Sequence, residues 1–246
     1  MSGGEAGPVA IVTAIPEELD AILSRTREVR RDADRFFTGR LGSVAVVLTA
    51  TGDGARRAGR GAAALCEAHR PRALVGMGVA GALTDDLSLF DILAARRVRD
   101  AAAEAPPPDA RMLARALAMP GAREATFVTA DGPVVTRAAK AALAAASGGP
   151  SAASVDMESA AWAREAAGRR IPYAIFRVIS DGPDEQLPAY LPECMDAEGS
   201  IRRGAVALRA IGQPSSISTL LAMRGRVREG SARLAAFLEH FLGTEA

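Results

Sequence analysis

The chain has 246 residues, of which 49% are hydrophobic and 24% are charged, and its formal net charge is +1 at neutral pH. This composition is ordinary for a globular protein, and the length is sufficient for a sizeable core. The balanced charge and the scattered arginines exclude a strongly basic surface of the kind that binds nucleic acid or anionic lipid.

Cysteine and histidine are scarce, with two residues of each type. Cys66 and Cys194 do not make a disulfide framework, and neither His69 nor His240 pairs with a cysteine at a zinc-ligand spacing, so we expect no metal site. The N-terminal residues lack the basic and apolar regions of a signal peptide, and no apolar run reaches membrane-spanning length. We therefore expect a cytoplasmic protein without an integral membrane segment.

The first half of the chain alternates short apolar segments with helical ones. Residues 9–14 are predicted as a buried strand, and Pro16 with the acids that follow it predicts the start of a helix. The next predicted elements are a strand at 41–49, a turn at 51–54, a helix at 55–67 and strands at 73–77 and 91–98.

The second half is richer in helix. Helices are predicted at 111–118, 136–146 and 157–168, and strands at 124–129 and 173–180. The stretch 180–201 is irregular, and loops of that length are uncommon unless they cover a site. Two further helices are predicted at 201–211 and 217–242.

Strands that alternate with helices predict the α/β class, here a three-layer αβα sandwich with a central, mostly parallel, twisted sheet. No internal repeat or linker divides the chain, so we expect a single domain over 1–246 with a C-terminal helical extension over about 187–246. In such open sheets, catalytic groups gather at the carboxyl ends of the strands.

Residues 76–81, Gly-Met-Gly-Val-Ala-Gly, fit the G-x-G-x-x-G pattern of dinucleotide-binding sites and follow a predicted strand. Asp100 lies about where such a site places its ribose-binding acid. However, only residues 82–90 separate this segment from the next strand, which leaves no room for the crossover helix that the motif requires. A dinucleotide-dependent oxidoreductase is therefore the weaker alternative, and the glycines indicate either a tight turn or close approach of the backbone to a small ligand.

Charged residues cluster near the last predicted strand and the helix before it. Glu158 lies at the start of helix 157–168, and Arg177 and Asp181 lie at the end of strand 173–180. A carboxylate for sugar hydroxyls, an acid for a departing base and an arginine beside them are the groups that cleavage of a nucleoside requires.

Four blocks of sequence, in order, resemble the nucleoside phosphorylase and nucleosidase superfamily, nearest to the methylthioadenosine and adenosylhomocysteine nucleosidases. The blocks are residues 14–19, 51–54 and 76–83, and the pair 155–161 with 177–181. The resemblance implies a phosphorylase/hydrolase-like fold and cleavage of the N-ribosidic bond of a purine nucleoside, with adenine as the expected base. It also implies a homodimer or larger homo-oligomer, and no cofactor, with phosphate as an alternative to water as co-substrate.

The same resemblance assigns roles to individual residues. Asp181 would protonate the purine as it leaves, which requires burial among apolar neighbours such as 175–179 to keep a proton on it at neutral pH. Glu18 would orient or deprotonate the attacking water, Glu158 would accept hydrogen bonds from the ribose hydroxyls, and Arg177 would hold the nucleophile or the neighbouring carboxylates. The other substrate-binding positions that it implies are Met157, Ser180, Val134, Ile15, Val79, Gly78 and Gly52.

Each of these roles has a purely structural alternative. Asp181 is suited to cap a turn before Gly182, and Glu158 and Glu18 are suited to the first turns of helices, where acids interact favourably with the helix dipole. Met157 is equally suited to fill the core. A nucleoside-binding protein without catalytic activity is therefore a second alternative, and Val79 favours it because the family often has serine there.

Departures from the family pattern bear on the reaction. Pro133 stands where an aromatic residue often stacks on the base, and the arginines of the phosphorylases are missing from their blocks. Arg40, Arg56 or Arg57 would have to replace them, so hydrolysis is favoured over phosphorolysis. Residues 187–192 and the later helices are more similar to the hopanoid-associated phosphorylases, which implies an adenine nucleoside with a bulky or apolar 5′ group.

Overall fold

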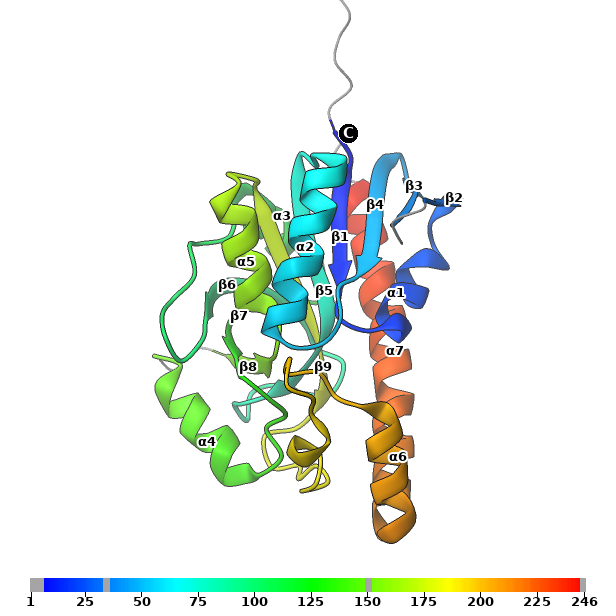
Figure 1. Ribbon diagram of the computed structural model, residues 1–246. Helices are drawn as coiled ribbons and strands as arrows, with labels where there is room; N and C mark the ends of the chain where they lie inside the picture. Colours follow the sequence, from blue (N-terminus) through cyan, green and yellow to red (C-terminus); the bar gives the residue numbers. More distant parts are fainter. Residues whose placement is uncertain (1–6, 33–35, 149–151, 244–246) are drawn as a thin grey trace, which may run out of the picture.

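The computed structural model describes residues 7–32, 36–148 and 152–243 (Figure 1). Residues 1–6, which contribute to the signal-peptide expectation, and residues 244–246 at the end of the predicted domain lie outside these ranges. The strands are β1 (Val9–Thr13), β2 (Arg27–Arg31), β3 (Phe37–Leu41), β4 (Val44–Ala50), β5 (Ala73–Ala82), β6 (Ile92–Arg99), β7 (Ala122–Thr129), β8 (Ala153–Asp156) and β9 (Tyr173–Asp181). The helices are α1 (Pro16–Leu23), α2 (Ala55–His69), α3 (Ala110–Leu117), α4 (Arg137–Ala146), α5 (Ser159–Gly168), the 3₁₀ turn η1 (Pro192–Cys194), α6 (Arg203–Gly212) and α7 (Ser215–Gly243).

The described strands form one sheet in the order β2-β3-β4-β1-β5-β8-β7-β6-β9. The pairs β1–β4, β1–β5, β5–β9, β6–β7 and β7–β8 are parallel. The edge hairpins β2–β3 and β3–β4, the short β5–β8 contact and β6–β9 are antiparallel. The predicted mostly parallel sheet is confirmed, but the extra β5–β9 pairing also closes strands β5 to β9 into a ring, which the sequence pattern did not indicate.

Helices cover both faces of the sheet, which confirms the three-layer arrangement. Helices α2 and α5 pack on one face, and α1, α3 and α7 pack on the other (Figure 1). Strand β1 shows why the sequence folds this way. Ala10 and Val12 face the first group of helices, whereas Val9 and Ile11 face the second, so the strand is buried along its length and its first four residues are apolar.

Residues 76–81 continue strand β5 instead of forming a turn, and β5 leads through a loop to β6 rather than into a helix. The context that a dinucleotide site requires is therefore not found at this segment. The glycines instead make room for side chains that pack against the strand. A Cβ atom on Gly76 would lie 2.8 Å from the Trp162 ring, and one on Gly81 would lie 2.8 Å from the Asp181 carboxylate.

Strands β2, β3 and β8 were not predicted. β2 is exposed along its whole length and rich in arginine, and β8 has only four residues, so neither shows the apolar alternation that identifies a strand. The predicted strand 41–49 contains a turn at Gly42, whose φ of 60° suits glycine, and this turn separates β3 from β4.

Helix α7 is partly an extension and partly a layer of the sandwich. Its N-terminal part forms a hairpin with α6 that projects beyond the carboxyl ends of the strands (Figure 1). Its C-terminal part is buried, where Phe237 and Phe241 lie against Phe176 of β9 with ring centroids 5.5 and 5.0 Å apart. Within the described ranges, no helix combines the length and the apolar composition needed to cross a membrane.

The contact of Phe241 with β9 predicts a large effect on stability. Phe241 is fully buried, so Phe241→Ala should lower the free energy of unfolding by about 3–5 kcal/mol in a urea titration. Leu117→Ala is the matched control, because Leu117 is 36% exposed, and its effect should stay within about 0.5 kcal/mol. A cost below about 1 kcal/mol for Phe241→Ala would show that α7 is not a structural layer of the domain.

Candidate active site

A cavity of about 210 Å³ lies at the carboxyl ends of β5, β8 and β9, beside the N-terminus of α1. It is where an open α/β sheet is expected to gather its functional groups. Most of the predicted site residues line it, namely Ile15, Glu18, Val79, Val134, Met157, Glu158, Arg177, Ser180 and Asp181.

Backbone amides bind the buried carboxylate of Glu18. It occupies the third position of α1 and is only 1% exposed. Its Oε2 accepts hydrogen bonds from the amides of Ala14 (2.9 Å) and Ile15 (3.2 Å), and its Oε1 accepts one from the amide of Val79 (3.0 Å). The alternative of a solvated first-turn acid is therefore wrong, and the carboxylate is fixed at the cavity wall.

Glu158 is also buried, immediately before the first residue of α5. Its Oε1 accepts a hydrogen bond from the amide of Gly54 at 3.0 Å, and its Oε2 accepts one from Arg177 Nη2 at 3.2 Å. The side chain thus connects the turn before α2 with strand β9 and does not simply interact with its own helix.

Arg177 is the cation beneath these carboxylates, and its side chain is 1% exposed. Its Nε lies 3.3 Å from Asp156 Oδ2, and its guanidinium lies 5.0 Å from the centre of the Trp162 ring. Gly78 lies behind it and not on the cavity wall, because a Cβ there would collide with the guanidinium and with Glu18. The prediction that Gly78 contacts substrate is therefore not supported, and its role is to admit the charged pair.

One guanidinium faces three buried carboxylates, which leaves the cluster with an excess of negative charge. Burial raises the pKa of Glu18, although Arg177 opposes the shift. Burial also raises the pKa of Glu158 to about 7 against the effect of Arg177, with help from the negative charges of Asp156 and Glu18. Burial alone would lower the pKa of Arg177, but the three carboxylates raise it. The cluster therefore exchanges a proton near neutral pH.

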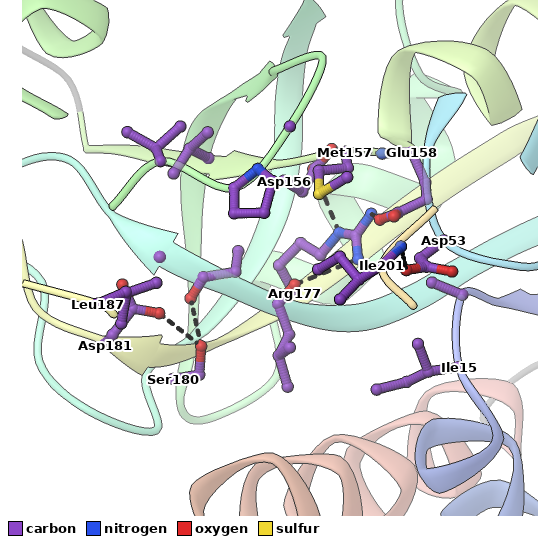
Figure 2. Close-up of a pocket in the computed structure, with 18 of the residues that line it drawn as sticks. Ile15, Asp53, Asp156, Met157, Glu158, Arg177, Ser180, Asp181, Leu187 and Ile201 are labelled. Atoms are coloured by element: carbon purple, nitrogen blue, oxygen red, sulfur yellow. Dashed lines mark hydrogen bonds and ion pairs between the residues drawn. The ribbon is translucent and has the colours of Figure 1, made fainter. Parts of the chain in front are cut away.

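Asp181 lies at the other end of the cavity, away from Glu158 (Figure 2). Its Oδ2 lies 2.5 Å from the Nζ of Lys140, whose side chain is 1% exposed, and its Oδ1 accepts a hydrogen bond from the Ser180 hydroxyl at 2.8 Å. The expected apolar environment is therefore wrong: a buried ammonium faces the carboxylate.

Sequence reasoning missed Lys140, although a signal was present. The chain contains 30 basic residues, and Lys140 is the only lysine among them. It lies in the alanine-rich helix α4, where a basic residue is expected to be solvated, yet it is among the largest fully buried side chains. The only lysine of an arginine-rich chain was therefore the position to single out.

The irregular segment after β9 covers the cavity, as its length suggested. Leu187 and Ile201 from this segment line the cavity. Asp53 holds the segment in place, because its carboxylate accepts hydrogen bonds from the Ser200 hydroxyl (2.9 Å) and the Ile201 amide (2.7 Å). Gly52 does not line the cavity. Its φ of 93° and the hydrogen bond that its amide donates to the Ala14 carbonyl shape the turn that presents Asp53.

The arginines considered as phosphate ligands do not reach the cavity. Arg57 is paired with Asp196 and Glu198, and Arg40 and Arg56 donate to backbone carbonyls elsewhere. In the part of the chain that the structure describes, no group of three or more histidine, cysteine or acidic side chains is arranged to hold a metal ion.

The raised pKa of Glu158 predicts how stability depends on pH. The side chain titrates at about 7 in the folded state and at about 4.3 in the unfolded state, so the folded state retains a proton that the unfolded state has lost between these values. Glu158 therefore makes the wild type lose stability as pH rises through this window, and Glu158→Gln lacks this contribution. The unfolding free energy of the variant minus that of the wild type should therefore be larger at pH 7.5 than at pH 4.5, by up to about 3 kcal/mol.

Urea titrations at the two pH values measure this difference. Glu17→Gln is the matched control, because Arg203 lowers the pKa of Glu17 and its loss should bring no gain at the higher pH. Unfolding free energies of the wild type and Glu158→Gln that change in parallel with pH would contradict a buried, proton-exchanging carboxyl at position 158.

Comparisons with known proteins agree with this geometry. The sequence matches the family model of the Phosphorylase superfamily over residues 8–211. A stretch of 100 residues is 30% identical to the 5′-methylthioadenosine/S-adenosylhomocysteine nucleosidase of Desulfotalea psychrophila, which covers 39% of this chain and 43% of that protein. A second nucleosidase of that name, from Maridesulfovibrio salexigens, is 31% identical over 100 residues, which again cover 39% of this chain and 43% of that protein. The chain thus matches less than half the length of these relatives.

Solved structures show the same fold over nearly the whole chain. An S-adenosylhomocysteine nucleosidase from Streptococcus pyogenes, in complex with 5-methylthiotubericidin, has a TM-score of 0.76 and 18% identity, and the match covers 99% of each chain. A 5′-methylthioadenosine/S-adenosylhomocysteine nucleosidase from Streptococcus pneumoniae has a TM-score of 0.74 and 20% identity, covering 96% of this chain and 98% of the other. With the family model matched over most of its length and this fold shared, the chain belongs to the phosphorylase superfamily.

Proposed function

We propose that the protein hydrolyses the N-ribosidic bond of an adenine nucleoside and releases the free base. The observation that carries this proposal is that Asp181, Glu158 and Glu18 line one cavity although they come from distant parts of the chain. Figure 2 shows Asp181 and Glu158 at opposite ends of that cavity. A nucleoside placed between them has its sugar at one end and its base at the other.

At the sugar end, the buried carboxylates stabilise the reaction electrostatically. As the bond to the base breaks, positive charge develops on the ribose, and the excess of negative charge around Arg177 is already oriented toward it. Glu158 accepts hydrogen bonds from the ribose hydroxyls, and Met157 packs against the sugar. Glu18, whose pKa burial raises, takes a proton from the attacking water.

At the base end, the departing purine receives a proton from Asp181. The base lies beside Pro133 and Val134, which line the cavity, and its edge contacts the main chain near Val134. General acid assistance of this kind contributes about 10²–10⁴-fold to the rate. Arg177 contacts no substrate in this scheme, because its guanidinium is already engaged by Asp156, Glu158, Ser159 and the Val79 carbonyl.

We propose water and not phosphate as the nucleophile. The wall beside Val79 holds the Glu18 carboxylate, bound by three amides that could otherwise bind an anion. A phosphate dianion would be repelled by this carboxylate, and the surface arginines are engaged elsewhere. Ile15, Val79, Leu187 and Ile201 make the remaining wall apolar, which supports a bulky or apolar 5′ substituent on the nucleoside.

A nucleoside-binding protein without turnover is the second candidate function. Lys140 favours it, because its side chain already binds the Asp181 carboxyl group that the departing base would otherwise contact. We further infer a reducing compartment such as the cytoplasm, which the free thiols of Cys66 and Cys194 support.

A substrate panel tests the proposal. The purified protein is incubated with adenosine, 5′-methylthioadenosine and an adenine nucleoside carrying a long apolar 5′ chain, with and without phosphate, and the products are read by mass. We expect adenine and the free sugar, at a rate that phosphate does not change. A sugar phosphate as product would overturn the choice of water, and saturable binding without adenine release would favour the second candidate.

Variants of the acids give a second test. Asp181→Asn and Glu158→Gln should each lower kcat for adenine release by about 10²–10⁴-fold, since each removes a group that acts in the transition state. Glu17→Gln is the control, because Glu17 adjoins Glu18 but does not line the cavity, and its kcat should remain within about twofold. Circular dichroism confirms that each variant is folded. Unchanged kcat in folded Asp181→Asn would refute the assigned role.

We also propose that the chain forms a homo-oligomer through the α6–α7 hairpin. Leu208 (71%), Ile211 (73%) and Leu221 (63%) are highly exposed there, and apolar side chains gathered on one surface element favour association. Leu208→Glu combined with Ile211→Glu should lower the mass measured by light scattering to that of a monomer, whereas Leu117→Glu on α3 should not. A monomeric wild type, or an unchanged mass in the double variant, would contradict this interface.

A further inference from the structure

Lys140 is the one position at which this chain uses lysine and not arginine. It is the only lysine among 30 basic residues, and its side chain is 1% exposed. Buried charges are rare unless they are paired or functional. The only lysine of the chain therefore lies beside Asp181, the carboxyl group that the proposed reaction needs as an acid.

The geometry around the ammonium is tight. Lys140 Nζ lies 2.5 Å from Asp181 Oδ2 and 2.6 Å from the carbonyl oxygen of Gly182, so two of its three protons are committed. Asp181 Oδ1, the other carboxyl oxygen, accepts from the Ser180 hydroxyl. Lys140 does not line the cavity, whereas Asp181 does, so a proton on Lys140 can reach a substrate only through Asp181.

A buried ammonium–carboxylate pair and a buried amine–carboxylic acid pair differ only in the position of one proton. In water the charged form prevails, but desolvation disfavours both charges and brings the two forms closer in free energy. The contact of 2.5 Å between Lys140 Nζ and Asp181 Oδ2 therefore lets one proton pass from the amine to the carboxyl group. Arginine could not fill this role, because its guanidinium does not release a proton in proteins.

We propose that Lys140 is a positioning residue that supplies Asp181 with the proton that the departing base receives. This inference rests on the proposed hydrolysis. A proton shifts from Nζ to the Asp181 carboxylate, and the resulting acid gives its proton to the purine as the C1′–N9 bond breaks and its electron pair moves to the base. Water adds its oxygen to C1′ and gives one proton to Glu18, which releases that proton to solvent. A proton taken up from solvent by Asp181 passes to the Lys140 amine and completes the cycle.

Two substrates separate this role from a merely structural one. An adenine nucleoside needs a proton on its leaving group, whereas a nitrophenyl riboside releases a stabilised phenolate without one. Lys140→Met should lower kcat/KM for the adenine nucleoside by about 10²-fold or more and leave that for the nitrophenyl riboside within about threefold. Lys140→Arg, which keeps the charge, should not restore the first activity. Equal losses on both substrates, or rescue by arginine, would overturn the inference.

A double variant covers the case in which Lys140→Met leaves an unpaired carboxylate and fails to fold. Asp181→Asn removes that charge, so Lys140→Met should be tolerated beside it. Because Lys140 acts only through Asp181, adding Lys140→Met to Asp181→Asn should change kcat/KM for the adenine nucleoside by less than about threefold. A further loss above about tenfold would overturn the inference. Failure of the wild type to release adenine is a separate result, which removes the proposed function and this inference with it.

Discussion

The burial of three carboxylates around Arg177 is the constraint on which the site depends. Removing a carboxylate from water costs several kcal/mol, and the cost is recovered only when a cation and further donors lie close to it. Arg177 contacts Asp156 and Glu158, and backbone amides bind Glu18 and Glu158. The charges are therefore compensated in part by a side chain and in part by the turns at which β1 and β4 lead into helices.

The glycines of β5 follow from the same constraint. In the register of β5 against β9, Gly78 pairs with Arg177 and Gly81 pairs with Asp181. A side chain at either glycine would occupy the space of the charged group, so both positions require the smallest residue. The G-x-G-x-x-G pattern thus arises from the side chains that pack against the strand, and its likeness to a dinucleotide motif is coincidental.

The sequence predicted the fold class and most elements, because apolar strands and helix starts leave clear local patterns. Most of the predicted residues that meet in the cavity were assigned through the resemblance to the family. The sequence did not predict the closure of β5 to β9, which depends on pairing between strands that are distant along the chain. It also assigned Asp181 an apolar environment, because Lys140 precedes it by 41 positions and nothing local connects the two. Glu18 and Glu158 were placed correctly, but their burial is a tertiary property that a first-turn acid does not reveal.

The two ends of the cavity differ in the cation that each one uses, and this difference has a chemical meaning. The sugar end has a guanidinium, whose charge is permanent, and a permanent charge suits carboxylates that must remain ordered while a cationic sugar forms. The base end has an ammonium, whose proton is exchangeable, beside the carboxyl that the departing purine would meet. If the two cations were exchanged, the sugar end would risk losing its fixed charge and the base end would have no proton to transfer. An otherwise arginine-only chain that keeps one lysine at this position is consistent with a division between a fixed charge and a movable proton.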